Sequence, residues 1–244
     1  MPGMSGTSSH LRLPDFVGLG TQKAATTYLW RQLSDHPEVM APNDKELRFF
    51  FRDVPVETYA AHFADVPTEK TCGEITPSYL YFPQVPGRID AVVPDARLFV
   101  ILRDPTERAF SQWLMLRQLG RVPLDLTFRE AFDRGLPSRA PMADRGLYAP
   151  QLERYGAARA SGRLLVLWYD DLVIDAASVV RSLYRHIGVD PNHRPRGLDD
   201  RVEARDVDAP VMTEDDRRAV VDFYRASIGD LEAMTGRDLS AWAS

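Results

Sequence analysis

Residues 15–33 decide the fold and read Asp15-Phe-Val-Gly-Leu-Gly20, Thr21-Gln-Lys-Ala-Ala-Thr-Thr27 and Tyr28-Leu-Trp-Arg-Gln-Leu33. The first six residues are a short apolar run bounded by glycine, which is typical of a buried strand. Leu29 and Leu33 are four residues apart and therefore share one face of a helix. The stretch predicts a strand, a tight loop and a helix in that order.

The same order of elements recurs further along the chain. Residues 96–102 are almost continuously apolar, as expected of a strand covered on both faces. Asp104-Pro105 suits the N-cap and first turn of a helix that ends near Gly120. A third strand over residues 164–169 precedes a helix from about 176 to 187.

Alternating helices and buried strands predict the α/β class, with a mostly parallel sheet flanked by helices. We expect a single domain over residues 14–244, preceded by a flexible N-terminal arm over residues 1–13. A last long helix is predicted to start at Thr213. Ligands of such sheets bind beyond the carboxyl ends of the strands, where loops 20–27 and 103–111 are expected.

Composition narrows the function classes. The chain has 244 residues, 44% of them hydrophobic, which is enough for a core without disulfides or a metal. Its single cysteine, Cys72, excludes an internal disulfide and a cysteine-based zinc site. A net charge of −5 disfavours general nucleic-acid binding. The sequence lacks a secretion signal or membrane span, so we expect a cytoplasmic protein, and the oligomeric state is not readable.

Loop 20–27 has the features of an anion site. Small residues open a helix there, so backbone N–H groups and the helix dipole favour a negative ligand. Lys23 adds a full positive charge, and it is one of only three lysines among the 30 basic residues. Thr26 and Thr27 add hydroxyl donors. The order differs from a Walker A loop, in which a serine or threonine follows the lysine directly and holds Mg²⁺.

Two further segments contain residues suited to the chemistry of an anionic donor. Residues 43–50 place Lys45 and Glu46 in an aromatic-flanked stretch. Residues 102–111 place Arg103 at a strand end and Ser111 two turns into the following helix, and an arginine with a hydroxyl can hold a phosphate. A structural ion pair with Glu107 explains Arg103 equally well, and helix packing explains Ser111.

Together these segments resemble PAPS-dependent sulfotransferases, whose donor is 3′-phosphoadenosine 5′-phosphosulfate (PAPS). Residues 21–29 resemble the 5′-phosphosulfate loop, and residues 101–111 resemble the 3′-phosphate motif. Residues 45–50 and 73–79 resemble segments of the carbohydrate-type branch, which is membrane-bound in eukaryotes and soluble in bacteria. Two further matches are Gly146-Leu-Tyr148 and residues 236–242.

The resemblance implies a P-loop-like sulfotransferase fold and an in-line transfer of a sulfuryl group from PAPS to a hydroxyl of a sugar or secondary metabolite. The product is 3′,5′-ADP, and no metal is required. Lys23 would stabilise the leaving phosphate, and Glu46 would be the general base. The donor would contact Gln22, Lys23, Ala24, Ala25, Thr26, Thr27, Arg103 and Ser111.

The acceptor side is predicted in less detail. An acceptor pocket could contain one cation and four aromatic side chains, although aromatic residues at such spacing more often belong to the core. These residues are Lys45, Phe49, Tyr79, Trp113 and Tyr148. Arg48 stands where the family frequently has histidine, so no acid–base or acceptor role of that histidine is supported here. Ile75 stands where lysine is common, which argues against a highly anionic polysaccharide acceptor. The arginine-rich segment 194–205 is either a lid over the nucleotide, by resemblance, or a solvated loop.

Two rival functions stay open at this point. A P-loop-type nucleotide kinase would depend on Mg²⁺ and would carry the order Gly-Lys-[Ser/Thr], which is missing here. A non-catalytic nucleotide-binding module would bind 3′,5′-ADP but would turn over no acceptor.

Overall fold

The computed structural model describes residues 11–42, 44–200, 202 and 209–244. Within these residues, four short strands form one sheet in the order β2-β1-β3-β4, and every pairing is parallel. The strands are β1 (Phe16–Gly18), β2 (Gly73–Ile75), β3 (Arg97–Leu102) and β4 (Leu164–Trp168). The predicted α/β class with a parallel sheet is confirmed.

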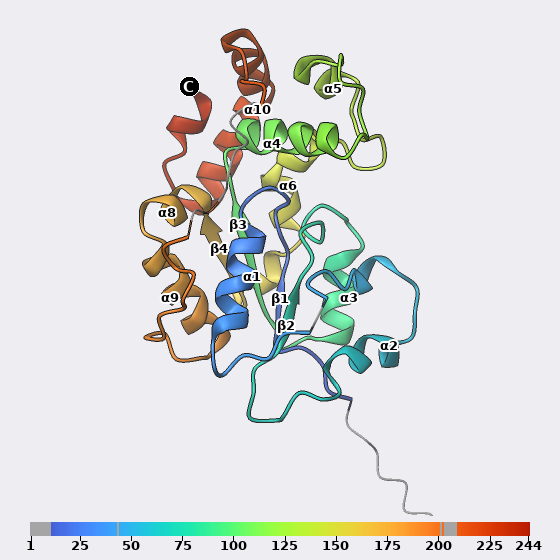
Figure 1. Cartoon of the computed structure of the whole chain (residues 1–244), viewed down its shortest axis with the longest axis vertical. Coiled ribbons are helices and arrows are strands. Elements are labelled where there is room, and N and C mark those ends of the chain that lie inside the picture. Colours follow the sequence, from blue (N-terminus) through green and yellow to red (C-terminus); the bar gives the residue numbers. More distant parts are fainter. Residues whose placement is uncertain (1–10, 43, 201, 203–208) are drawn as a thin grey trace, which may run out of the picture.

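Helices cover both faces of the sheet (Figure 1). Along β3, Leu98, Val100 and Leu102 join one hydrophobic core, whereas Phe99 and Ile101 join the other. The second core is closed by α1 (Thr26–Asp35) and α9 (Ala176–Ile187), and the first receives side chains of α3 (Val85–Val92), α6 (Tyr148–Glu153) and α7 (Gly156–Ala160). This alternation explains why the strand is apolar at nearly every position.

Local sequence signals set the ends of three helices. The Asp104 carboxylate accepts the Thr106 N–H at 2.8 Å and caps α4 (Pro105–Gln118). Gly188 ends α9 with a φ of 85°, and Thr213 caps α10 (Glu214–Thr235). The predicted starts of α4 and α10 and the predicted end of α9 near residue 187 are therefore confirmed.

Glu107, three residues after the N-cap Asp104, does not complete a capping box. Its carboxylate bonds to Arg217 of α10 instead of folding back on the start of its own helix. Since α10 lies more than a hundred residues away in the sequence, no local pattern predicts this pairing.

A helical layer lies beyond the carboxyl ends of the strands (Figure 1). It consists of α4, α5 (Phe128–Asp133) and the start of α10, whose aromatic side chains pack together, for example Phe132 against Tyr224. The remaining short elements are η1 (Phe49–Phe51), α2 (Val56–Ala60), η2 (Ala61–Phe63), η3 (Asp144–Gly146), α8 (Tyr169–Ile174) and η4 (Ser240–Ala243).

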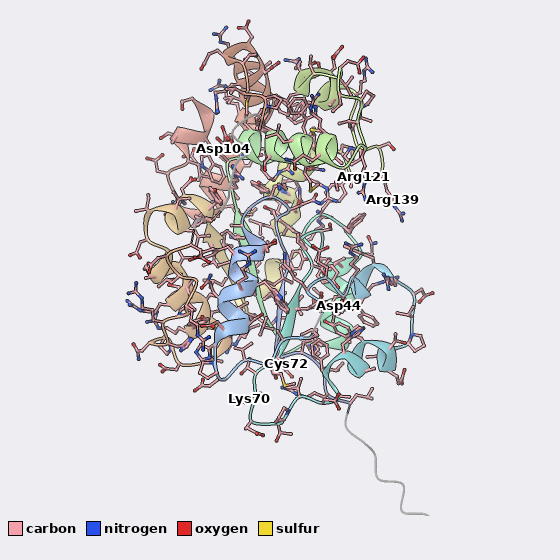
Figure 2. All side chains as sticks on the ribbon, viewed as in Figure 1. Asp44, Lys70, Cys72, Asp104, Arg121 and Arg139 are labelled. Carbon is pink, nitrogen blue, oxygen red and sulfur yellow. The ribbon has the colours of Figure 1, made fainter. Side chains whose placement is uncertain are left out.

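The two ends of the sheet differ in chemistry. Figure 2 shows Asp104 at the end where β3 leads into α4, and Cys72 at the opposite end, just before β2. Cys72 is a buried free thiol, and burial raises its pKa to about 12, so it stays protonated. The candidate site residues belong to the Asp104 end.

Most of the expected N-terminal arm over residues 1–13 is not described by the structure. Residues 1–10 lie outside the described residues. Arg12 bonds to the Asp15 carboxylate and to the Lys70 carbonyl, and Leu13 packs on the core. These two residues are therefore attached to the domain. No helix among the described residues is long and apolar enough to cross a membrane.

Candidate active site

The loop between β1 and α1 wraps around the start of the helix. Lys23 and Ala25 adopt φ values of 69° and 64°, a left-handed conformation that costs a non-glycine residue roughly 1–2 kcal/mol. The Thr21 N–H donates to the Ile101 carbonyl at 2.9 Å, which ties the loop to β3. No side chain caps α1 at Ala25, so its first-turn N–H groups are available to an anion.

A cavity of about 300 Å³ lies in front of this loop. It brings Lys23 and Glu46 together, although they come from different segments. The residues lining it are Gln22, Lys23, Ala25, Thr26, Thr27, Tyr28, Lys45, Glu46, Pro77, Met115 and Val202. Ala24 is not among them and is fully buried. Sequence reasoning missed Met115, which lies four residues after Ser111 and therefore on the same face of α4.

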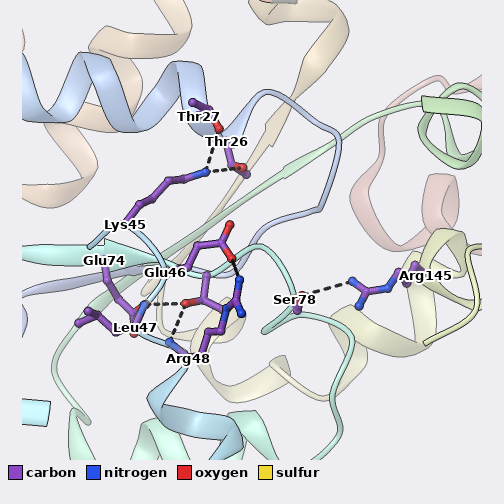
Figure 3. A network of polar contacts seen from close by, with 10 residues as sticks. Thr26, Thr27, Lys45, Glu46, Leu47, Arg48, Glu74, Ser78 and Arg145 are labelled. Carbon is purple, nitrogen blue, oxygen red and sulfur yellow. Dashed lines mark hydrogen bonds and ion pairs between the residues drawn. The ribbon is translucent and has the colours of Figure 1, made fainter. Parts of the chain in front are cut away.

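Lys45 lies against loop 20–27. Its Nζ donates to Thr26 Oγ1 at 3.2 Å and to Thr27 Oγ1 at 3.1 Å (Figure 3). Burial lowers the pKa of Lys45, and the neighbouring Glu46 charge partly opposes this. The sequence placed Lys45 on the acceptor side, whereas the structure adds it to the cations at the helix N-terminus.

Glu46 projects to the cavity from the same segment. Its Oε2 accepts from Arg48 Nη2 at 2.8 Å, and the two side chains are 34% and 57% exposed. An exposed ion pair of this kind contributes little energy. An entering hydroxyl group can therefore displace Arg48 at small cost and reach the Glu46 carboxylate.

The segment around Glu46 is held by Glu74, a fully buried carboxylate on β2. Its Oε2 accepts the Leu47 N–H at 3.2 Å. Three hydroxyl groups also donate to it, from Tyr59 (3.0 Å), Thr76 (2.6 Å) and Tyr79 (2.8 Å). Burial raises the pKa of Glu74 to about 7 against the opposing effect of these hydrogen bonds. Glu74 thus acts on the site through the backbone, not by facing the cavity.

Arg103 connects residues 101–111 to loop 20–27. Its Nη1 donates to the Lys23 carbonyl at 2.9 Å, and its guanidinium lies 4.5 Å from the Tyr169 ring centre. The ion pair with Glu107, the structural alternative, is also present at 3.9 Å. Ser111 is half-buried on α4. Neither Arg103 nor Ser111 lines the 300 Å³ cavity.

A model described as "Sulfotransferase family" matches residues 40–193. The chain belongs to this sulfotransferase family. Human bifunctional heparan sulfate N-deacetylase/N-sulfotransferase 3 (Homo sapiens) is 30% identical over 204 residues, covering 75% of this chain and 23% of that protein. Heparan sulfate glucosamine 3-O-sulfotransferase 3B1 of Mus musculus is 30% identical over 185 residues, covering 73% and 47%.

A solved sulfotransferase shares the whole architecture. The structure from Alicyclobacillus acidocaldarius matches with a TM-score of 0.83 and 27% identity, covering 96% of this chain and 100% of that one. The chain spans less than half the length of the two heparan sulfate enzymes.

The four aromatic side chains considered for an acceptor pocket lie in the core of this sulfotransferase. All four rings are buried and none lines the cavity: Phe49, Tyr79, Trp113 and Tyr148. Phe49 stacks on Tyr59 at 4.3 Å, and the Tyr148 hydroxyl donates to the Arg103 carbonyl at 2.8 Å. Their surfaces are used in packing, and we therefore do not place them against an acceptor.

The arginine-rich segment 194–205 contacts α1 and then approaches loop 20–27. Asp35 accepts the Arg196 N–H, while Gln32 and Tyr28 donate to the next two carbonyls, at 3.0, 3.2 and 2.6 Å. Val202 then reaches the cavity. Residues 201 and 203–205 lie outside the described residues, so the lid interpretation stays a prediction.

Proposed function

We propose that this sulfotransferase transfers a sulfuryl group from PAPS to an acceptor hydroxyl and releases 3′,5′-ADP. The supporting observation is one cavity that combines an uncapped helix N-terminus, the two lysines Lys23 and Lys45, and the carboxylate of Glu46. The cationic part suits an anionic donor, and the carboxylate beside it suits removal of a proton.

The donor end would neutralise charge as the nucleotide leaves. The acceptor oxygen forms a bond to sulfur, the bond from sulfur to the bridging phosphate oxygen breaks, and 3′,5′-ADP departs with the electron pair. Lys23, Lys45 and the N–H groups at the start of α1 would bind the developing negative charge. Preorganised donors of this kind each contribute about 10²–10³ in rate. These cations supply the neutralisation for which a kinase uses Mg²⁺.

The acceptor end would contain the base. Glu46 would take the proton of the attacking hydroxyl once Arg48 has moved away, a role that contributes about 10²–10⁴ in rate. Pro77 and Met115 border the same cavity and would limit how the acceptor enters. We propose a hydroxyl of a sugar or of a secondary metabolite as acceptor.

Arg103 and Ser111 would hold the 3′-phosphate and so select PAPS over ATP. In support, the bond from Arg103 to the Lys23 carbonyl keeps the guanidinium beside the donor loop. The kinase alternative is less favoured because Lys45 occupies the threonine hydroxyls that would otherwise face Mg²⁺. A cytoplasmic location stays a prediction.

Transfer of radiolabelled sulfate from PAPS to a panel of sugar and phenol hydroxyls tests the proposal. Lys23→Ala and Glu46→Gln should each lower transfer at least about 100-fold. Glu46→Gln should still bind 3′,5′-ADP in a thermal-shift assay, whereas Lys23→Ala should bind it less tightly. Lys70→Ala is the matched control, because Lys70 lies at the opposite end of the sheet (Figure 2). Full activity of Glu46→Gln would exclude it as the base, and stabilisation by Mg-ATP alone would favour the kinase.

A further inference from the structure

Arg145, in η3, is mostly buried, and its hydrogen bonds are long. Its Nη1 reaches Ser78 Oγ at 3.5 Å and its Nε reaches the Ala140 carbonyl at 3.4 Å. Both distances exceed the 2.9 Å typical of such bonds. The guanidinium also lies 5.1 Å from the Tyr81 ring centre. Among the described residues, no carboxylate pairs with Arg145.

The surroundings make this charge costly. Burial lowers the pKa of Arg145 to about 10, and the positive charge of Arg108 acts in the same direction. Arg108 itself is fully buried, and its two Nη atoms donate to Gln112 and to the Met142 carbonyl. Arg108 therefore has a structural role, whereas the hydrogen-bond capacity of Arg145 is only weakly used. At neutral pH, Arg145 remains a cation that an anion would stabilise.

Arg145 does not line the cavity, but it contacts Ser78, which adjoins the cavity lining in the sequence. Ser78 directly follows Pro77, which lines the cavity together with Glu46. Figure 3 shows the Arg145 side chain reaching Ser78 from one side, with Glu46 and Arg48 on the other. Tyr81, over which the guanidinium lies, is half-exposed. An acceptor whose hydroxyl meets Glu46 would extend over Pro77 and Ser78 towards Arg145.

We propose that Arg145 binds an anionic group of the acceptor, a carboxylate being the simplest case, and thereby selects acidic hydroxyl compounds over neutral ones. The planar guanidinium can donate two parallel hydrogen bonds to a carboxylate. The inference rests on the proposed function, because it assigns the acceptor class of the same site. One such cation suits a single acidic group near the reacting hydroxyl.

Calorimetry on the full chain saturated with 3′,5′-ADP tests this assignment. The probes are 4-nitrophenyl β-D-glucuronide and 4-nitrophenyl β-D-glucoside. They differ only at C6, which is a carboxylate in the glucuronide and a hydroxymethyl group in the glucoside. The wild type should bind the glucuronide roughly 10- to 100-fold more tightly, the range expected for a charge-assisted hydrogen bond. Arg145→Gln should bind both probes alike, and Arg145→Lys should keep part of the preference because it keeps the charge.

Arg154→Gln is the matched control. Arg154 donates to the carbonyls of Tyr81 and Leu80, so it supports the same segment without offering a site to the acceptor. A purely structural effect would change both arginine variants equally, and thermal unfolding checks that each variant is folded. An absent preference in the wild type, or a preference that survives in Arg145→Gln, overturns the inference. Failure to bind 3′,5′-ADP overturns the proposed function and the inference that rests on it.

Discussion

Glu74 should make the stability of the protein fall as the pH rises. Its side chain is fully buried, and every partner that it has is a neutral donor. Burial raises its pKa from 4.5 to about 7, which corresponds to about 3 kcal/mol of unfolding free energy. The substitution Glu74→Gln keeps the size of the side chain and removes its titration.

The sign follows from proton binding. Below about pH 4.5 the Glu74 carboxyl is protonated in both the folded and the unfolded state. Its full contribution to the free energy of unfolding is then present. Between pH 4.5 and 7 the unfolded chain releases the proton while the folded chain keeps it, so stability is lost as the pH rises through the folded pKa. Above pH 7 both states are ionised and the loss is complete.

Urea unfolding of the wild type and Glu74→Gln from pH 4.5 to 8.5 measures this effect. The free energy of the wild type minus that of the variant should decrease by about 3 kcal/mol across the range. Burial also raises the pKa of Asp104, to about 6, but Asp104 is present in both proteins and cancels in the difference. A difference that stays constant with pH would refute the assignment of a raised pKa to Glu74.

Two other variants test the donor site and the core. Arg103→Ala should weaken binding of 3′,5′-ADP at least about tenfold in calorimetry but change 5′-AMP binding little, since a charged hydrogen bond to the 3′-phosphate is lost; equal losses would contradict its role. Gly146→Ala would place a methyl group 2.6 Å from the Tyr224 ring and should lower the unfolding free energy by about 1–3 kcal/mol in urea. Gly87→Ala in α3 meets no atom within 4 Å and should raise it by about 0.5–1 kcal/mol, and the opposite order would count against this packing.

Much of the fold follows from local patterns. The apolar run of β3, the Asp104-Pro105 start of α4 and the glycine that ends α9 all lie where the sequence predicts them. Such signals depend on a few neighbouring residues, because helix capping and strand burial act over short distances along the chain. The carboxyl ends of parallel strands lie at one edge of the sheet. The position of loop 20–27 at this edge could therefore be predicted from the sequence.

The contacts between side chains in the site could not be predicted from such local patterns. Lys45 meets Thr26 across 19 residues of sequence, and Arg145 meets Ser78 across 67. The aromatic residues Tyr79 and Tyr148 were candidates for an acceptor pocket, yet both side chains are buried in the core.

The sequence by itself determined the class of fold, the position of β3, the ends of helices that carry capping residues, and the family. Only the tertiary structure decided that Lys45 contacts Thr26 and Thr27 and that Glu74 is a buried carboxylate surrounded by neutral donors. It also decided that Arg145 pairs with no carboxylate in the part of the chain that the structure describes. The physical reason is that secondary structure depends on neighbours along the chain, whereas burial, pKa and charge pairing depend on neighbours in space.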